Sequence, residues 1–292
     1  MTPLSFAPPT ALAYFSALVA EDAGFALLEA AICVAHDEPA APDAQTVLAD
    51  IDSLAARLKA RLPADASALR RLQALNRYFF GELGFAGNVN NYYDRRNSYL
   101  HEVLASRRGI PITLALLYIE LATQLGLAAF GVSFPGHFLV KLRMPQGEVV
   151  IDPVNGRSLS REDLDERLAP FRARHGLEGD FDTPLGLFLQ AAPPRDVLAR
   201  LLFNLKEIHR TAEDWPRLLA VQQRLVLLLP QAFEERRDRG LAWAELGRPV
   251  EAADDLSAYL AARPDADDAR PLAERLAELQ AQLRAGGAPG LH

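Results

Sequence analysis

The octapeptide RGIPITLA at residues 108–115 marks a change in the kind of structure that the chain forms. Pro111 opens the most apolar predicted helix, which ends near Gly126. Proline suits the first position of a helix because it lacks a backbone N–H, and an N–H at that position would have no partner inside the helix. After Gly126 the pattern changes to that of β-structure, with strands predicted at residues 129–134, 137–143 and 148–152 and a turn at 145–147. A helix followed by an antiparallel hairpin predicts a compact α+β unit.

Upstream of this point the sequence is helical. Apolar residues recur every three or four positions, which is the period of a helix with one buried face. The segments concerned are residues 10–20, 23–36, 44–62 and 66–83, and a short helix is predicted at 97–106. The stretch from Gly81 to Tyr93 is rich in Gly and Asn and predicts irregular structure.

Composition and charge narrow the class of protein. The chain has 292 residues, a net charge of −7 and one cysteine, Cys33. The acidic balance argues against binding of nucleic acid, and a single cysteine excludes an intramolecular disulfide. We find no signal-peptide pattern and no apolar run that reaches the roughly 18 residues of a membrane span. These features predict a soluble, cytoplasmic protein without membrane contact.

The C-terminal third contains an internal repeat. Pro230 and Pro264 are 34 residues apart, and residues 239–247 (RGLAWAELG) look like part of a tetratricopeptide repeat. The copy before Pro230 is degenerate, and a further helix is predicted at 271–283. Trp215 and Trp243 mark a candidate binding surface, although we favour a place for both in the core between helices. The predicted domains are residues 1–180 and 193–284, followed by a disordered tail at 285–292.

Four segments together resemble the bacterial SirB family. They are Asn97-Ser98, residues 107–114, residues 135–140 (PGHFLV) and Ile151-Asp152-Pro153. The resemblance covers nearly the whole chain. It implies a transglutaminase-like, papain-like core followed by tetratricopeptide-type repeats, and it does not imply an established reaction.

The resemblance places a triad of the cysteine type around Pro111. Such a site needs a thiolate at the start of the helix, a histidine within reach of it and a third group that holds the imidazole. His137 and Asp152 fit the second and third roles, whereas the nucleophile position holds Pro111. The two side chains share a face of the hairpin only if even-numbered residues pair with odd-numbered ones. Alternatively, His137 is a structural residue and Asp152 a turn carboxylate.

Other nucleophiles have weak support in the sequence. Thr113 offers the nearest hydroxyl, but a threonine inside a helix usually bonds a preceding carbonyl. Ser133 has no motif around it, and Cys33 lies in an apolar helical run typical of inert packing. A metal site built from His137, Asp152 and His101 lacks the spacing typical of zinc ligands.

The sequence therefore predicts a non-catalytic, transglutaminase-like binding or regulatory protein that uses no cofactor and no metal. A protein or peptide partner would bind through the groove around Pro111 or through the repeat surface. The alternative is an amide-bond hydrolase or acyl transferase in which His137 and Asp152 serve a nucleophile other than cysteine.

Overall fold

The computed structural model describes residues 9–21, 24–177 and 184–286. The chain forms two compact units, one of residues 26–201 and one that joins residues 1–25 to residues 202–292. The division falls inside helix α9 (Pro194–Thr211). It differs from the predicted domains, because helix α1 (Ala11–Leu18) belongs with the C-terminal helices and packs on α10 (Trp215–Leu228).

The larger unit, residues 26–201, begins with helices, as the apolar periodicity predicted. They are α2 (Leu27–Cys33), α3 (Ala44–Lys59), α4 (Ala68–Asn76), α5 (Leu100–Ser106) and α6 (Pro111–Gln124). A π-helical turn, Arg77–Glu82, continues α4, and a 3-10 turn, Arg95–Ser98, precedes α5. Asp43 and Ser67 cap α3 and α4 by accepting bonds from the amides of Thr46 and Arg70.

Four antiparallel strands form the sheet of this unit. In spatial order they are β3 (Ala128–Val132), β4 (Leu139–Met144), β5 (Gly147–Ile151) and β6 (Ser158–Leu159). Met144 pairs with Gly147, so the hairpin turn is centred between Pro145 and Gln146. Even-numbered residues of β4 therefore pair with odd-numbered residues of β5. This pairing is one of those that allow His137 and Asp152 to face the same way.

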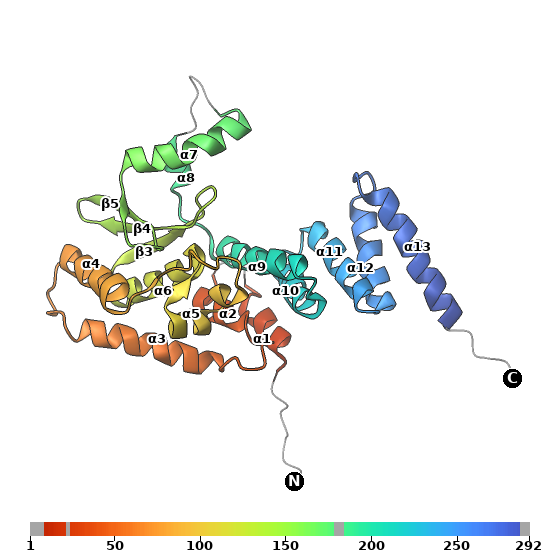
Figure 1. Cartoon of the computed structure of the whole chain (residues 1–292), viewed down its shortest axis with the longest axis horizontal. Coiled ribbons are helices and arrows are strands. Elements are labelled where there is room, and N and C mark those ends of the chain that lie inside the picture. Colours follow the sequence, from red (N-terminus) through yellow and green to blue (C-terminus); the bar gives the residue numbers. More distant parts are fainter. Residues whose placement is uncertain (1–8, 22–23, 178–183, 287–292) are drawn as a thin grey trace, which may run out of the picture. The chain divides into compact units, whose positions relative to one another are not determined.

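Helices cover both faces of the sheet (Figure 1). Helix α6 packs on β3 and β4, where Gly131 leaves room for Phe138 and Ile119. The opposite face carries Val132, Leu139 and Val150, which form one apolar core with Leu164 and Leu168 of helix α7. Helix α7 (Arg161–His175) was not predicted, nor was the short helix α8 (Leu185–Phe188). The arrangement confirms the α+β class of the core.

The other unit contains a series of helical hairpins. After the end of α9 come α10, α11 (Phe233–Glu245), α12 (Pro249–Ala262) and α13 (Ala269–Gly286) (Figure 1). Gly240 allows α11 and α12 to approach, since a Cβ there would lie 3.1 Å from Leu256 Cγ. Trp243 packs, partly buried, against the core around Leu256 and Tyr259, and Trp215 is half-buried.

Helix α13 includes the first two residues of the predicted disordered tail, and residues 287–292 lie outside the described part of the chain. Over the described ranges, no helix combines the length and the apolar character that crossing a bilayer requires.

Candidate functional site

His137 is presented by a tight turn just before β4. The turn Phe134-Pro135-Gly136-His137 is closed by a bond from the His137 amide to the Phe134 carbonyl, 3.0 Å long. Proline at the second position and a glycine with φ of +70° at the third are typical of a type II turn. The sequence PGH therefore fixes where the imidazole leaves the backbone.

Arg200, on α9, holds this turn from outside. Its Nη1 donates to Ser133 Oγ at 2.7 Å and to the Phe134 carbonyl at 3.3 Å. The guanidinium also lies over the Phe138 ring, 5.7 Å from its centroid, and burial lowers the pKa of Arg200. Ser133, considered as a nucleophile from the sequence, thus accepts a hydrogen bond from a cation. Sequence reasoning missed Arg200, because its contact with the turn arises from tertiary packing.

Asp152 follows the last residue of β5 and is the partner of His137. Its Oδ1 lies 2.9 Å from His137 Nε2 and accepts a second bond, 3.1 Å long, from the Val154 amide. Asp152 is therefore a turn carboxylate and the histidine partner at once. The two interpretations that the sequence left open are compatible.

The Asp152 carboxylate is buried and ionised. Burial by itself opposes ionisation of the group, but hydrogen bonds and charge from His137, the Val154 amide and Arg167 outweigh it, and they lower the pKa of Asp152 to about 2. Because the carboxylate can only accept, His137 Nε2 carries the proton of this bond. In the neutral imidazole Nδ1 is then an acceptor.

Arg167, from helix α7, completes the cluster. Its Nη1 donates to Asp152 Oδ2 at 2.9 Å. Both oxygens of Asp152 are therefore engaged, one with His137 and Val154 and one with Arg167. Sequence reasoning missed this arginine because α7 itself was missed. The capping box at the start of α7, Ser160 with Asp163, was the available signal.

Pro111 occupies the first turn of α6, as predicted, and Thr113 secures that turn. The Thr113 hydroxyl accepts a bond from the Ile110 amide at 3.2 Å and lies 2.8 Å from the Asn97 carbonyl. The Thr113 side chain has no exposed surface. Its hydroxyl therefore fixes the helix start to the segment around Asn97.

Backbone hydrogen bonds connect the start of α6 with the turn after Asp152. The short parallel strands β1 (Ala86–Gly87) and β2 (Arg108–Gly109) pair immediately before Pro111. The Gly87 amide donates to the Val154 carbonyl at 3.0 Å, and the Asn88 amide donates to the Gly109 carbonyl at 3.1 Å. One ladder thus fixes both segments. The structure brings His137, Asp152 and Arg167 into direct contact and ties them to the Pro111 segment through the backbone.

Two other residues considered from the sequence are placed elsewhere. Cys33 is buried in α2. His101 lies on α5, where its ring stacks on Tyr99 with 6.1 Å between centroids. Within the described ranges, no group of three or more histidine, cysteine or acidic side chains is arranged to hold a metal ion.

The fold and the site define a transglutaminase-like core followed by helical repeats. The family model described as "Transglutaminase-like superfamily" matches residues 45–203, and a "Tetratricopeptide repeat" model matches residues 205–277. The chain belongs to the transglutaminase-like superfamily and carries tetratricopeptide repeats.

Relatives in bacteria match this chain over most of their length. A UPF0162 protein of Xylella fastidiosa is 39% identical over 245 residues, which is 84% of this chain and 86% of the relative. A UPF0162 protein of Pseudomonas aeruginosa is 33% identical over 254 residues, covering 87% and 91%. F-box only protein 21 of Mus musculus is 46% identical over 70 residues, 24% of this chain and 11% of that protein.

Proposed function

We propose that this protein is a non-catalytic member of the superfamily, of the SirB type, that binds a protein or peptide segment at the Pro111, His137 and Asp152 site and at its helical repeats. The observation that carries the proposal is the pairing of an intact histidine–carboxylate contact with a helix start that has no nucleophile. The repeats support it, because tetratricopeptide stacks commonly serve as protein-binding surfaces.

Proline removes two chemical functions from the helix start. A side chain that attacks a carbonyl is missing, and so is the backbone N–H of the first helical position. In acyl transfer, N–H groups near the nucleophile stabilise the oxyanion, and one donor is worth a factor of about 10² to 10³ in rate. A single proline at residue 111 thus removes the nucleophile and a donor of this kind.

The hydroxyls and the thiol considered from the sequence do not replace the missing nucleophile. The Thr113 hydroxyl is buried between the Ile110 amide and the Asn97 carbonyl, Ser133 Oγ accepts from Arg200, and Cys33 is buried. In the described part of the chain, no hydrogen bond joins His137 Nδ1 to a hydroxyl or thiol. Residual triad members without a nucleophile retain little of a triad's rate.

One observation favours the enzymatic alternative. The Asp152 carboxylate orients the imidazole and leaves Nδ1 as an acceptor, and the His137 side chain is 25% exposed. An imidazole in this state is competent to take a proton from a water molecule or from a group on a substrate. His137 would then be the general base of an amide-bond hydrolase or acyl transferase.

Activity assays separate the two functions. The full-length protein and its His137→Ala variant are incubated with a panel of fluorogenic peptide amides and esters. We expect both proteins to match the rate without protein. Turnover that the His137→Ala substitution abolishes would establish the enzymatic alternative.

The Pro111→Cys variant tests how much of the site persists, and we expect an acyl-thioester adduct, detected by mass, that depends on His137.

Binding is tested by photo-crosslinking within bacterial cells. A crosslinking amino acid is placed at Tyr93, 74% exposed on the loop after β1, and as a control at Leu69, 56% exposed on α4. We expect a discrete crosslinked protein at Tyr93 that is lost with His137→Ala and is absent at Leu69. Identical products at both positions would argue against binding at the site.

We further propose a cytoplasmic location, in keeping with the single, buried cysteine.

A further inference from the structure

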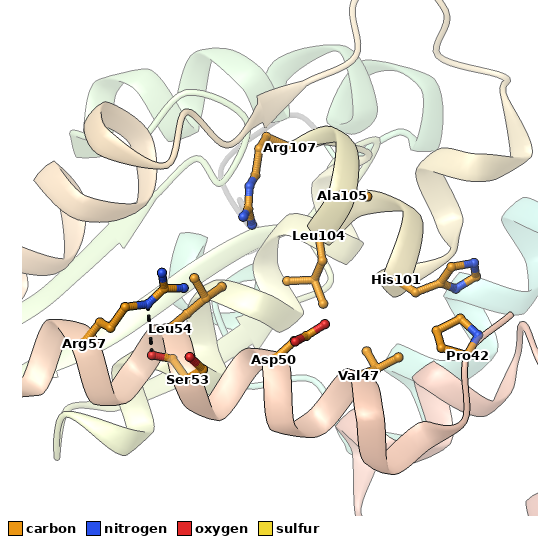
Figure 2. Close-up of a pocket in the computed structure, with 10 residues that line it drawn as sticks. All are labelled: Pro42, Val47, Asp50, Ser53, Leu54, Arg57, His101, Leu104, Ala105 and Arg107. Atoms are coloured by element: carbon orange, nitrogen blue, oxygen red, sulfur yellow. Dashed lines mark hydrogen bonds between the residues drawn. The ribbon is translucent and has the colours of Figure 1, made fainter.

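A second site lies between helices α3 and α5, inside the larger unit. A cleft of about 320 Å³ opens there, at the small end of the range for small-molecule pockets. Figure 2 shows the side chains that line it, from α3 below and α5 above. The polar lining comes from Asp50, Ser53 and Arg57 on α3 and from His101 and Arg107 at α5. The apolar lining is Pro42, Val47, Leu54, Leu104 and Ala105.

The charges around the cleft are not matched. Arg57 and Arg107 extend toward the same space, with Asp50 as the one carboxylate of the lining (Figure 2). Among the residues that the structure describes, none of these three forms an ion pair. The Arg57 side chain has only a 3.3 Å bond from Nε to the Ser53 carbonyl. Two guanidinium groups against one carboxylate leave a surplus of one positive charge.

Arg107 is poorly solvated as well as unpaired. Its guanidinium lies over the Phe85 ring, 4.7 Å from the centroid, and its buried Nη1 has no hydrogen-bond partner within the described residues. Burial, and next the like charge of Arg57, lower the pKa of Arg107, with Tyr78 and Asp50 acting against them. An anion in the cleft would relieve the repulsion between the two arginines and restore the solvation that Arg107 lacks.

Arg107 has a backbone conformation that is unusual for arginine. Arg107 ends α5 with φ of +60°, in the left-handed region where helices commonly place glycine. A residue with a Cβ costs about 1 kcal/mol more than glycine in that conformation. The chain nevertheless carries an arginine whose side chain enters the cleft, an outlier that indicates a role for the side chain.

We propose that this cleft binds a small organic monoanion, with its carboxylate or phosphodiester group between Arg57 and Arg107. The apolar part of the ligand packs on Val47, Leu54 and Leu104. A monoanion balances the surplus charge of the lining. The lining includes none of Pro111, His137 and Asp152, and the proposal does not depend on the function proposed for those residues.

Calorimetric titration of the full chain tests this site with four probes. Hexanoate carries both the charge and the apolar part, acetate and inorganic phosphate carry the charge alone, and hexylammonium carries the apolar part with the opposite charge. We expect saturable one-to-one binding of hexanoate, about tenfold tighter than acetate because the added methylenes are partly buried. Hexylammonium is expected not to bind. Phosphate binding tighter than acetate would assign a phosphodiester as the natural ligand class, and the reverse order would assign a carboxylate.

Three variants make the assignment specific. Arg57→Gln keeps a good helix former, and Arg107→Asn suits the left-handed conformation, so both are expected to fold, as checked by circular dichroism. Each should weaken hexanoate binding about tenfold or more through loss of a charged hydrogen bond. Lys59→Gln, which removes the same charge from α3 outside the cleft, should bind like the parent. Equal binding of hexanoate and hexylammonium, unchanged affinity in both arginine variants, or no saturable binding of any anion would overturn the proposal.

Discussion

Replacing Asp152 by Asn tests whether the buried cluster around it stabilises the fold. The substitution keeps the size of the side chain and removes the charge that faces His137 and Arg167. Asp152 is 3% exposed, so its ionisation is not screened by direct contact with solvent. Because Arg167 remains partly exposed, with 33% of its side chain accessible, water can solvate it after the change. The expected loss of stability therefore comes from removing the Asp152 charge, and no unpaired cation is left buried.

The pKa of Asp152 sets the expected magnitude. A shift from 3.8 to about 2 means that the folded protein binds this proton less tightly than the unfolded chain. At about 1.4 kcal/mol per unit, ionisation of Asp152 contributes roughly 2 to 3 kcal/mol to the free energy of unfolding at pH 7. The contribution is complete above the unfolded pKa, falls to about half near pH 3 and is lost as the pH drops through the folded pKa.

Urea unfolding, followed by far-ultraviolet circular dichroism from pH 7 down to pH 3, measures this contribution. We expect Asp152→Asn to lose roughly 2 to 3 kcal/mol at pH 7 and about half of that at pH 3. The matched control is Asp165→Asn, which removes a carboxylate on α7 that is 39% exposed and paired with Arg172 at 3.2 Å. A surface pair of this kind should cost less than about 1 kcal/mol. Equal losses for the two variants, or a loss for Asp152→Asn that does not change with pH, would refute the reasoning.

Substitutions at three further positions probe the packing inside each unit, and each is measured as a change in the urea midpoint. Gly156→Ala should cost about 3 kcal/mol, because Gly156 has φ of +75° and an added Cβ would lie 2.5 Å from the Phe80 ring; a loss below 1 kcal/mol would contradict this. Thr113→Val should cost about 2 kcal/mol by removing the hydroxyl that accepts from the Ile110 amide and donates to the Asn97 carbonyl, which leaves that amide only a 3.4 Å bond to the same carbonyl; Thr113→Ser should restore most of the loss. Gly240→Leu should cost about 2 kcal/mol, because the added side chain would push α11 away from Leu256 on α12. Tryptophan fluorescence reports this last change, since both tryptophans lie in the repeat unit.

Local patterns in the sequence were sufficient for much of the core. The spacing of apolar residues predicted α3 and α6 to within a few residues, and Pro111 stands at the first position of α6. The hairpin was also predicted, and its register is one of those that allow His137 and Asp152 to meet. These features depend on interactions between residues close in sequence, which is why a single sequence contains them.

Features that depend on tertiary packing were not predictable. Helix α7 has only two buried positions, Leu164 and Leu168, so its apolar pattern is too weak to identify it. Without α7, the contact of Arg167 with Asp152 could not be inferred. The grouping of α1 with the C-terminal helices likewise arises from long-range packing on α10.

The contacts of Asp152 give a reason for the His137–Asp152 pair that requires no reaction. Its carboxylate closes the turn after β5 through the Val154 amide and joins β5 to α7 through Arg167. Pro111 suits the start of α6, because proline lacks the N–H that would have no partner within the helix at that position. Folding is thus served by both features, whereas acyl transfer would require a thiolate and an N–H where the proline stands. The Asp152→Asn stability measurement and the His137→Ala activity assay therefore answer separate questions. The proposed function requires that turnover does not change with His137→Ala, and a large loss of stability in Asp152→Asn would account for the His137–Asp152 pair without a reaction.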